Sequence, residues 1–156
     1  MSPLPPLVSP KTTRHLEHIR AMIRGEAEPP PIAKLIGFRC VGVEIGQAIF
    51  ELDAGPQHAN PLGTLHGGII GDLADAALGM AMATTLEEDE TFTSLDLTVK
   101  FLKPIWTARI RAVGQMVKRN RSLGLLECEV TDPGGSLVAR AYSTCMVLRG
   151  EQAKGR

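Results

Sequence analysis

The sequence predicts an α+β fold in which one antiparallel sheet curls around a single apolar helix. Two observations predict this arrangement. Residues 67–86 give roughly five helical turns with few polar side chains, so this helix needs other structure around it. Residues 91–148 alternate polar and apolar side chains between turn-forming residues, which is typical of half-buried antiparallel strands.

The composition indicates one ordinary globular domain. The chain has 156 residues, enough for one domain with its own core, and its 17 basic and 17 acidic side chains balance. This balance gives no indication of binding to nucleic acid or to a membrane. The odd set of three cysteines lacks metal-ligand spacing and indicates reduced thiols in a cytoplasmic protein: Cys40, Cys128 and Cys145.

The N-terminal part is expected to precede the main fold. Residues 1–9 are rich in proline and show no signal-peptide pattern, so we expect a disordered segment there and a single domain over 10–148. Ser9-Pro10 is a typical helix start, and the apolar spacing that follows predicts a helix to Arg24. A short helical turn is expected over 32–36.

Two strands are expected before the apolar helix. Residues 38–45 and 48–52 alternate, and Gly46-Gln47 between them predicts a hairpin. In the first strand, Val41, Val43 and Ile45 are expected to share one face.

Four strands are expected after the apolar helix. The acidic run 87–90 is interpreted as a solvated turn that closes the helix. Segment 91–102 has a clean period of two, which predicts one strand with a single apolar face formed by Leu95, Leu97, Val99 and Phe101. The remaining strands are expected over 106–117, 123–131 and 136–148, followed by a flexible tail over 149–156.

The apolar helix carries two carboxylates, Asp72 and Asp75, on one side. Each would cost about 2.5–3.5 kcal/mol at a bilayer centre, so the helix is expected in a protein core and not in a membrane. Burial of an unpaired charge is costly. At least one of the two carboxylates is therefore expected to face a cleft or a subunit interface.

The start of the same helix offers a site for negative charge. Gly67 and Gly68 leave backbone N–H groups unobstructed at a helix N-terminus, where a carbonyl oxygen that becomes an oxyanion could be held. Gly67 and Asp75 are about 12 Å apart along the axis, too far for one carbonyl to contact both on one helix. If both take part, Asp75 must come from a partner subunit with an antiparallel helix, which predicts a homodimer with two shared sites.

Several of these residues together resemble a known family. Asn60, the turn His66-Gly67-Gly68, Asp75 and the strand 94–102 resemble the hotdog-fold acyl-CoA thioesterases, most closely the phenylacetate-degradation (PaaI-like) group with the mammalian thioesterase superfamily member 2 type. The resemblance covers residues 35–148. It implies a curved antiparallel sheet around one long helix, here with an extra N-terminal helix.

The resemblance also implies the reaction: hydrolysis of an acyl-CoA thioester to a carboxylic acid and free coenzyme A. A homodimer, associating further into a homotetramer, is the expected assembly. No cofactor is implied beyond the coenzyme A of the substrate, and neither a metal-ligand motif nor a nucleotide fingerprint is present in the sequence.

By resemblance, Asp75 acts as general base on water or as nucleophile on the thioester carbonyl. Its apolar neighbours would raise its pKa, which suits a base, whereas an ion pair on the helix surface is the alternative interpretation. Gly67, with Gly68 beside it, is the expected oxyanion donor; the alternative is that these glycines only allow a sharp entry into the helix.

Other residues of the resemblance have supporting roles. His66 is expected to shape the turn and not to transfer a proton. Asn60 corresponds to a residue near the thioester carbonyl or water, unless it is an ordinary Asn-Pro turn residue. Ser94 corresponds to a serine that positions water, with Thr93 as the competing assignment. A different branch uses a threonine one turn after its acidic residue, and Gly79 departs from that pattern.

Substrate binding is expected from two further sets of residues. Coenzyme A phosphates need cations, and Lys118, Arg119 and Arg121 form a basic loop where relatives carry basic residues; a solvated hairpin is the alternative. Met80 and Met82 are candidates for an adaptable wall of the acyl pocket.

Two other functions are compatible with this fold. One is an enoyl-thioester hydratase, which pairs an acidic residue with a catalytic histidine in an arrangement that the sequence does not show. The other is a non-catalytic acyl-CoA sensor, against which the retained Asp75 argues.

Overall fold

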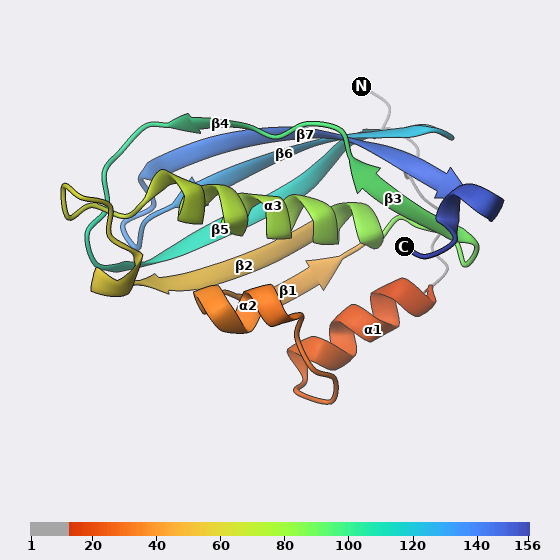
Figure 1. Ribbon diagram of the computed structural model, residues 1–156, viewed down its shortest axis with the longest axis horizontal. Helices are drawn as coiled ribbons and strands as arrows, with labels where there is room; N and C mark the ends of the chain where they lie inside the picture. Colours follow the sequence, from red (N-terminus) through yellow and green to blue (C-terminus); the bar gives the residue numbers. More distant parts are fainter. Residues whose placement is uncertain (1–12) are drawn as a thin grey trace, which may run out of the picture.

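A computed structural model describes residues 13–156 as a curled antiparallel sheet wrapped around one long helix (Figure 1). This is the predicted α+β architecture, with an extra helix at the N-terminal side. The elements in chain order are α1 (Arg14–Ile23), α2 (Pro31–Ile36), β1 (Arg39–Glu44), β2 (Gln47–Ala54), the 3-10 turn η1 (Pro56–His58), α3 (Gly67–Ala83), β3 (Glu90–Ser94), β4 (Thr98–Phe101), β5 (Ala108–Arg119), β6 (Leu123–Thr131), β7 (Leu137–Arg149) and the 3-10 turn η2 (Gly150–Ala153).

The sheet has seven strands in the order β1-β2-β5-β6-β7-β3, and β4 also pairs with β7 beside β3. All of these pairs are antiparallel. One edge of the sheet is therefore β1, and the other edge is formed by β3 and β4. Figure 1 shows α3 across the concave face, with α1 and α2 next to the β1 edge.

One side of α3 forms the centre of the hydrophobic core. Its buried side chains face the sheet: Ile70, Leu73, Ala74, Ala77, Leu78, Ala81 and Met82. The helix backbone comes very close to β5 at Gly114, where a Cβ would lie 2.4 Å from the Ala77 carbonyl oxygen. The other side of α3 stays open and carries Asp72 and Asp75, so the helix is enclosed on one face only.

The N-terminal helices bear out part of the prediction. The expected start at Ser9-Pro10 and the expected disorder over 1–9 lie outside the described residues. The α1 helix is instead capped by Thr13, whose hydroxyl oxygen accepts from the Leu16 N–H at 3.3 Å. The α2 turn forms as predicted and ends at Gly37 with a left-handed φ of 97°.

The predicted inward face of β1 is wrong. The register against β2 shifts between Cys40 and Gly42, which marks a β-bulge. Because the bulge reverses the alternation, Val41 is 36% exposed while Val43 packs against the core. Ile45 is also 36% exposed because it follows the end of β1, in the hairpin turn.

The predicted single strand 91–102 is also wrong, because it divides into β3 and β4. Asp96 causes the division: its side chain accepts from the Thr144 N–H at 2.7 Å, and its carbonyl accepts from the Ser143 hydroxyl at 2.8 Å. These bonds replace ladder pairing. The expected buried face is therefore open, with Leu95, Leu97 and Phe101 exposed by 55%, 40% and 58%.

The acidic run after α3 is not only a solvated turn. Glu90 is buried and begins β3, where its carboxylate pairs with Arg119 at 3.0 Å and with Arg149. This cluster ties β3 to the ends of β5 and β7. The predicted tail begins at Arg149, the last residue of β7, and continues into the turn η2.

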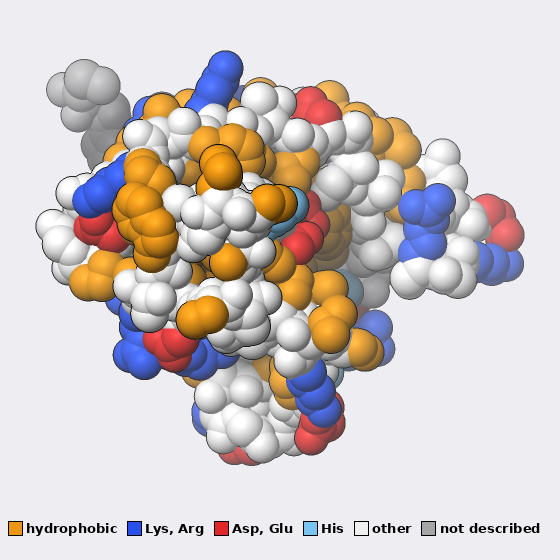
Figure 2. Space-filling view, turned by 60° about the vertical axis from the view of Figure 1, so that its left-hand side comes forward, with side chains coloured by type: hydrophobic (Ala, Val, Ile, Leu, Met, Phe, Trp, Pro, Cys, Tyr) orange, Lys and Arg blue, Asp and Glu red, His pale blue; other side chains and the backbone are white. Residues whose placement is uncertain are grey.

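The surface around the start of α3 carries several apolar side chains. Figure 2 turns this end of the molecule forward and shows hydrophobic side chains as separate patches between polar ones. Leu62, Leu102 and Trp106 are exposed on the loops of this region. Within residues 13–156, no helix is both long enough and apolar enough to cross a membrane.

Candidate functional site

The start of α3 presents a free backbone donor. His66 is the N-cap residue, with extended φ and ψ of −61° and 132°, and its Nδ1 accepts from the Gly68 N–H at 2.8 Å. The His66 carbonyl accepts from the N–H groups of Ile69 and Ile70. Among the described residues, the Gly67 N–H meets no acceptor, so it is the donor that this helix end offers to a ligand.

The Phe101 ring of β4 occupies the space that a side chain at Gly67 would fill. A Cβ at position 67 would lie 3.0 Å from Cζ of the Phe101 ring, so the ring packs directly on the helix start. This contact fixes the first turn of α3 to the free edge of the sheet.

The loop before α3 is organised by Asn60. Its Oδ1 accepts from the N–H groups of Leu62 and Thr64 at 2.9 and 3.2 Å, and its Nδ2 donates to the Thr64 hydroxyl at 2.7 Å. The alternative interpretation of Asn60 as a turn residue is therefore seen in the structure. A direct contact between its second amide hydrogen and substrate stays a prediction.

The carboxylate of Asp75 lies at the rim of a cavity, on the open side of α3. The protein atoms around it and the negative charge of Asp72 raise its pKa above the ordinary value of 3.8. No cation neutralises it in the described part of the chain. The ion-pair alternative for Asp75 is therefore not what the single chain shows, and a carboxylate with a raised pKa suits a general base.

Ser94 lies on the same side of the molecule as Asp75. Its hydroxyl is 3.7 Å from the Cys145 sulfur, and burial together with the negative charge of Asp75 raises the pKa of that thiol. Phe92, two residues earlier on β3, packs toward Gly79 of α3. Because neighbouring residues of a strand point to opposite faces, Ser94 shares this inner face and Thr93 does not.

The cavity lies between α3, β1 and the two N-terminal helices and has a volume of about 570 Å³. Asp75 and Met80 line it from α3, and Phe92 lines it from β3. Met82 is not part of this wall: it is fully buried on the sheet side of α3, where it packs against Gly124. Of the two methionines predicted to form an acyl pocket, only Met80 lines this cavity.

Residues 62–139, which include the start of α3, Asp75 and Ser94, match the family model described as the thioesterase superfamily. The chain belongs to the thioesterase superfamily.

Named relatives agree with this membership. The superfamily chain is 27% identical to 1,4-dihydroxy-2-naphthoyl-CoA hydrolase of Listeria monocytogenes over 76% of its length and 96% of that protein. It is 24% identical to human acyl-coenzyme A thioesterase 13, over 85% and 96% of the two chains.

A solved structure is also similar. The phenylacetic acid degradation-related protein of Ralstonia eutropha JMP134 superposes with a TM-score of 0.75 and 30% identity, over 83% of this chain and 98% of that one. The PaaI-like resemblance and the hotdog fold are thus confirmed, and thioester hydrolysis is the reaction class of the superfamily.

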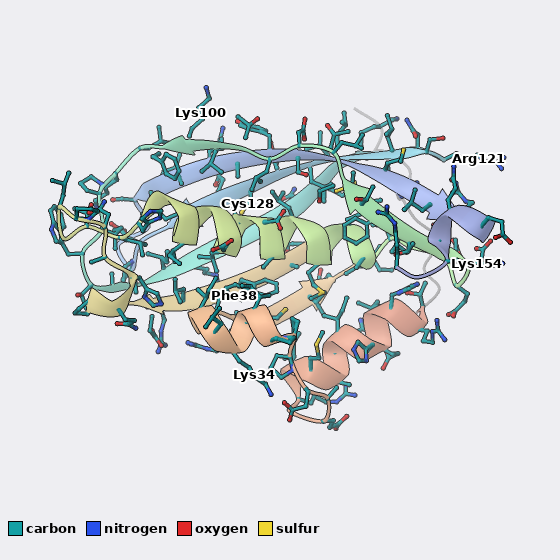
Figure 3. All side chains as sticks on the ribbon, viewed as in Figure 1. Lys34, Phe38, Lys100, Arg121, Cys128 and Lys154 are labelled. Carbon is teal, nitrogen blue, oxygen red and sulfur yellow. The ribbon has the colours of Figure 1, made fainter. Side chains whose placement is uncertain are left out.

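In this superfamily member, the three basic residues predicted to bind coenzyme A have different environments. Arg119 is half-buried and engaged by Glu90, and burial lowers its pKa. Lys118, near the end of β5, and Arg121, in the turn between β5 and β6, are both exposed. Figure 3 shows Arg121 at the end of the molecule where α3 ends. Only Lys118 and Arg121 are therefore free for a phosphate group.

Sequence reasoning missed the part of this thioesterase that α1, α2 and β1 contribute. The N-terminal wall of the cavity includes Met22, Phe38 and Cys40, none of which belongs to a recognisable motif. The sequence shows only that Gly79 and Ala83 follow Asp75 at intervals of four, which places two small residues on the helix face that carries this carboxylate.

Proposed function

We propose that this protein hydrolyses acyl-CoA thioesters to a carboxylic acid and free coenzyme A, in sites shared between two subunits. The Gly67 N–H polarises the thioester carbonyl, and Asp75 of the partner subunit acts as general base on water or as nucleophile. One observation carries the proposal: the same helix offers an unengaged N–H at its start and an unpaired carboxylate with a raised pKa about 12 Å further on.

The separation of these two groups is the reason for a dimer. Antiparallel α3 helices across a two-fold axis bring Gly67 of one protomer next to Asp75 of the other. The free edge of the sheet supports such a contact, because Leu95, Leu97 and Phe101 are exposed beside it and unpaired edges seek partners. On the outer face of the sheet, exposed Leu125 and Tyr142 favour further association into a tetramer.

In the reaction, the oxygen of water attacks the thioester carbon while Asp75 takes the proton of that water. Ser94 positions the water, and the Gly67 N–H stabilises the negative oxygen of the tetrahedral intermediate. The carbon–sulfur bond then breaks and the proton passes to the thiolate of coenzyme A. If Asp75 attacks the carbonyl itself, the carbon–sulfur bond breaks, the thiolate of coenzyme A leaves and a mixed anhydride with Asp75 remains; water then cleaves this anhydride, which releases the acid and restores the carboxylate.

Charge and the named relatives support coenzyme A as the leaving group. Lys118 and Arg121 are exposed cations at the end of the molecule where α3 ends. In an antiparallel dimer, this end lies next to Gly67 of the partner subunit. Two of the relatives are named for hydrolysis of coenzyme A thioesters.

Release of free thiol from a panel of acyl-CoAs tests the proposal. Wild type is expected to hydrolyse some members, and Asp75→Asn is expected to lose turnover by roughly 10²–10⁴-fold while it still binds substrate. Asp72→Asn is the matched control, since it removes the neighbouring carboxylate from the same helix and should retain turnover at alkaline pH. No turnover on any acyl-CoA, with binding that the Asp75 variant leaves unchanged, would contradict hydrolysis and indicate a sensor.

A further inference from the structure

The cavity beside Asp75 runs along α3. Asp75, Gly79 and Ala83 lie one helical turn apart from each other on one face, and all three line the cavity. At the α-helical rise, Gly79 lies about 6 Å and Ala83 about 12 Å beyond Asp75. A second cavity of about 410 Å³ under α1 shares Met22, Met80 and Ala83 with the first one. The first cavity therefore extends from the candidate carboxylate toward the end of α3, and the second cavity borders it at Met22, Met80 and Ala83.

The walls of the first cavity are mainly apolar, whereas Arg14, His15 and His18 contribute to the second. Three aromatic rings line the first cavity: Phe50 from β2, Phe92 from β3 and Phe38 from the residue just before β1. Figure 3 shows Phe38 between α2 and α3. Cys40 also lines it, and burial raises the pKa of its thiol to about 11.

The cations at the rim are already neutralised. Lys34 forms an ion pair with Glu28, and Figure 3 shows its side chain on the side of α2 that is turned away from α3. Arg39 is bonded to Glu51 and Asp53, at 3.2 and 3.3 Å. A polar or charged acyl group inside the cavity would thus lose its hydration without gaining a free cation from the described lining residues. A hydrocarbon acyl group has no such hydration to lose when it enters the cavity.

Gly79 lines the cavity at a place where a larger side chain would fill part of its volume. Glycine weakens a helix interior relative to alanine, so its presence in α3 needs a reason. A Cβ at this position would be 3.6 Å from the Phe92 ring, an ordinary contact, so the fold itself does not require glycine here. Any atoms beyond that Cβ would have to enter the cavity between Asp75 and Ala83.

We propose that this cavity receives an unsubstituted hydrocarbon acyl group of medium length, and that Gly79 sets how large this group can be. The inference rests on the proposed function, since it takes Asp75 as the carboxylate next to the thioester. The acyl group then lies in the protomer that supplies Asp75, while Gly67 of the partner subunit contacts the carbonyl oxygen. A volume of about 570 Å³ lies within the range of small-molecule sites, roughly 300–1,000 Å³.

Leucine substitutions at increasing distance from Asp75 test the inference. We compare kcat/KM for saturated acyl-CoAs from acetyl to palmitoyl in wild type, Gly79→Leu and Ala83→Leu. In Gly79→Leu, the acyl chain with the highest kcat/KM is expected to be shorter than in wild type. The ratio of kcat/KM for decanoyl-CoA to kcat/KM for acetyl-CoA should fall by at least roughly tenfold, since one methylene in an apolar pocket already has an effect of about this size. Ala83→Leu is expected to lose only the longest chains.

Matched controls separate this effect from damage to the helix. Gly79→Ala should shift the optimum in the same direction by less, and it serves where a leucine variant does not fold. Turnover of acetyl-CoA is the internal reference in each variant, because damage to the helix would lower it together with the turnover of longer chains.

Three results would overturn the inference. They are an unchanged optimum in Gly79→Leu, an equal loss of activity for all chain lengths, and a wild-type preference for 1,4-dihydroxy-2-naphthoyl-CoA over every alkanoyl-CoA. A wild type that hydrolyses no acyl-CoA at all would be a different failure, because it would contradict the proposed function itself.

Discussion

The Nδ1 atom of His66 accepts a hydrogen bond from the Gly68 N–H at 2.8 Å, whereas the Gly67 N–H has no acceptor in the described chain. Two adjacent glycines at one helix end therefore have different roles. The one with a capped N–H stabilises the helix, and the one with a free N–H can bind a substrate oxygen. This division supports Gly67 over Gly68 as the oxyanion donor.

Gly67→Pro should remove the oxyanion donor with little damage to the helix. Proline suits the first position of a helix, and the extended ψ of His66, 132°, is compatible with a following proline. We expect kcat to fall by about 10²–10³-fold, the usual effect of removing one such donor. Gly67→Ala is the control, since it keeps the N–H and presses on the same Phe101 ring; equal losses in both variants would speak against the oxyanion role.

His66→Ala should act on stability more than on chemistry. Loss of the N-cap acceptor is expected to cost about 1 kcal/mol in the free energy of unfolding, measured by denaturant titration. Asparagine is a good N-cap residue, so His66→Asn should recover most of the stability and the turnover. If His66→Asn instead loses turnover by orders of magnitude with wild-type stability, His66 transfers a proton.

Asp72→Asn should move the acid limb of the pH–rate profile to lower pH. A general base works when it is deprotonated, so the rate rises as the pH passes the pKa of Asp75, which desolvation and the charge of Asp72 both raise. Removing the Asp72 charge favours the ionised form of Asp75 and lowers that pKa. The profile of kcat/KM against pH measures this shift, and a limb that stays in place would show that Asp75 does not control the rate.

Glu90→Gln should destabilise the fold. Its carboxylate is 5% exposed and pairs with Arg119 and Arg149, and breaking a buried pair of this kind costs about 3–5 kcal/mol. Glu129→Gln is the control at an exposed pair with Arg140, where about 0–1 kcal/mol is expected. Urea titrations at neutral pH compare the two variants, and equal effects would contradict a structural role for the Glu90 cluster.

The same Glu90 cluster predicts how the free energy of unfolding depends on pH. Burial alone would raise the pKa of Glu90, but the Glu87 N–H and the two arginines outweigh it and hold the pKa below the ordinary value of 4.5. The ionised form therefore stabilises the fold fully above pH 4.5, and this contribution is lost as the pH falls through the lowered pKa. The stability difference between wild type and Glu90→Gln should shrink in that acidic range.

The fold was largely predictable because its main signals are local. The apolar run of α3 and the period of two in β5, β6 and β7 determine the layers without long-range information. The break at Asp96 was not predictable, since the bonds that cause it come from Ser143 and Thr144 on another strand. The bulge at Cys40 likewise depends on pairing with β2 and not on the residues of β1 alone.

The candidate site divides in the same way. Gly67, His66 and Asp75 stand in one continuous stretch, so their spacing could be read from the sequence. The pairing of Arg119 with Glu90 could not, because 29 residues separate the partners and the charge run around Glu90 is typical of a solvated turn. The cavity was also hidden, since its walls come from α1, α2, β1 and β3, which meet only in the folded chain.

The two carboxylates of α3 also bear on what happens after hydrolysis. Asp72 and Asp75 stand one turn apart, and the charge of the first makes ionisation of the second less favourable. In the proposed reaction, the thioester group brings no charge to this place, whereas the acid released from it becomes an anion there. Repulsion from Asp75 then favours departure of the acid once its proton is lost, so the proposed reaction should show little product inhibition by the free carboxylic acid.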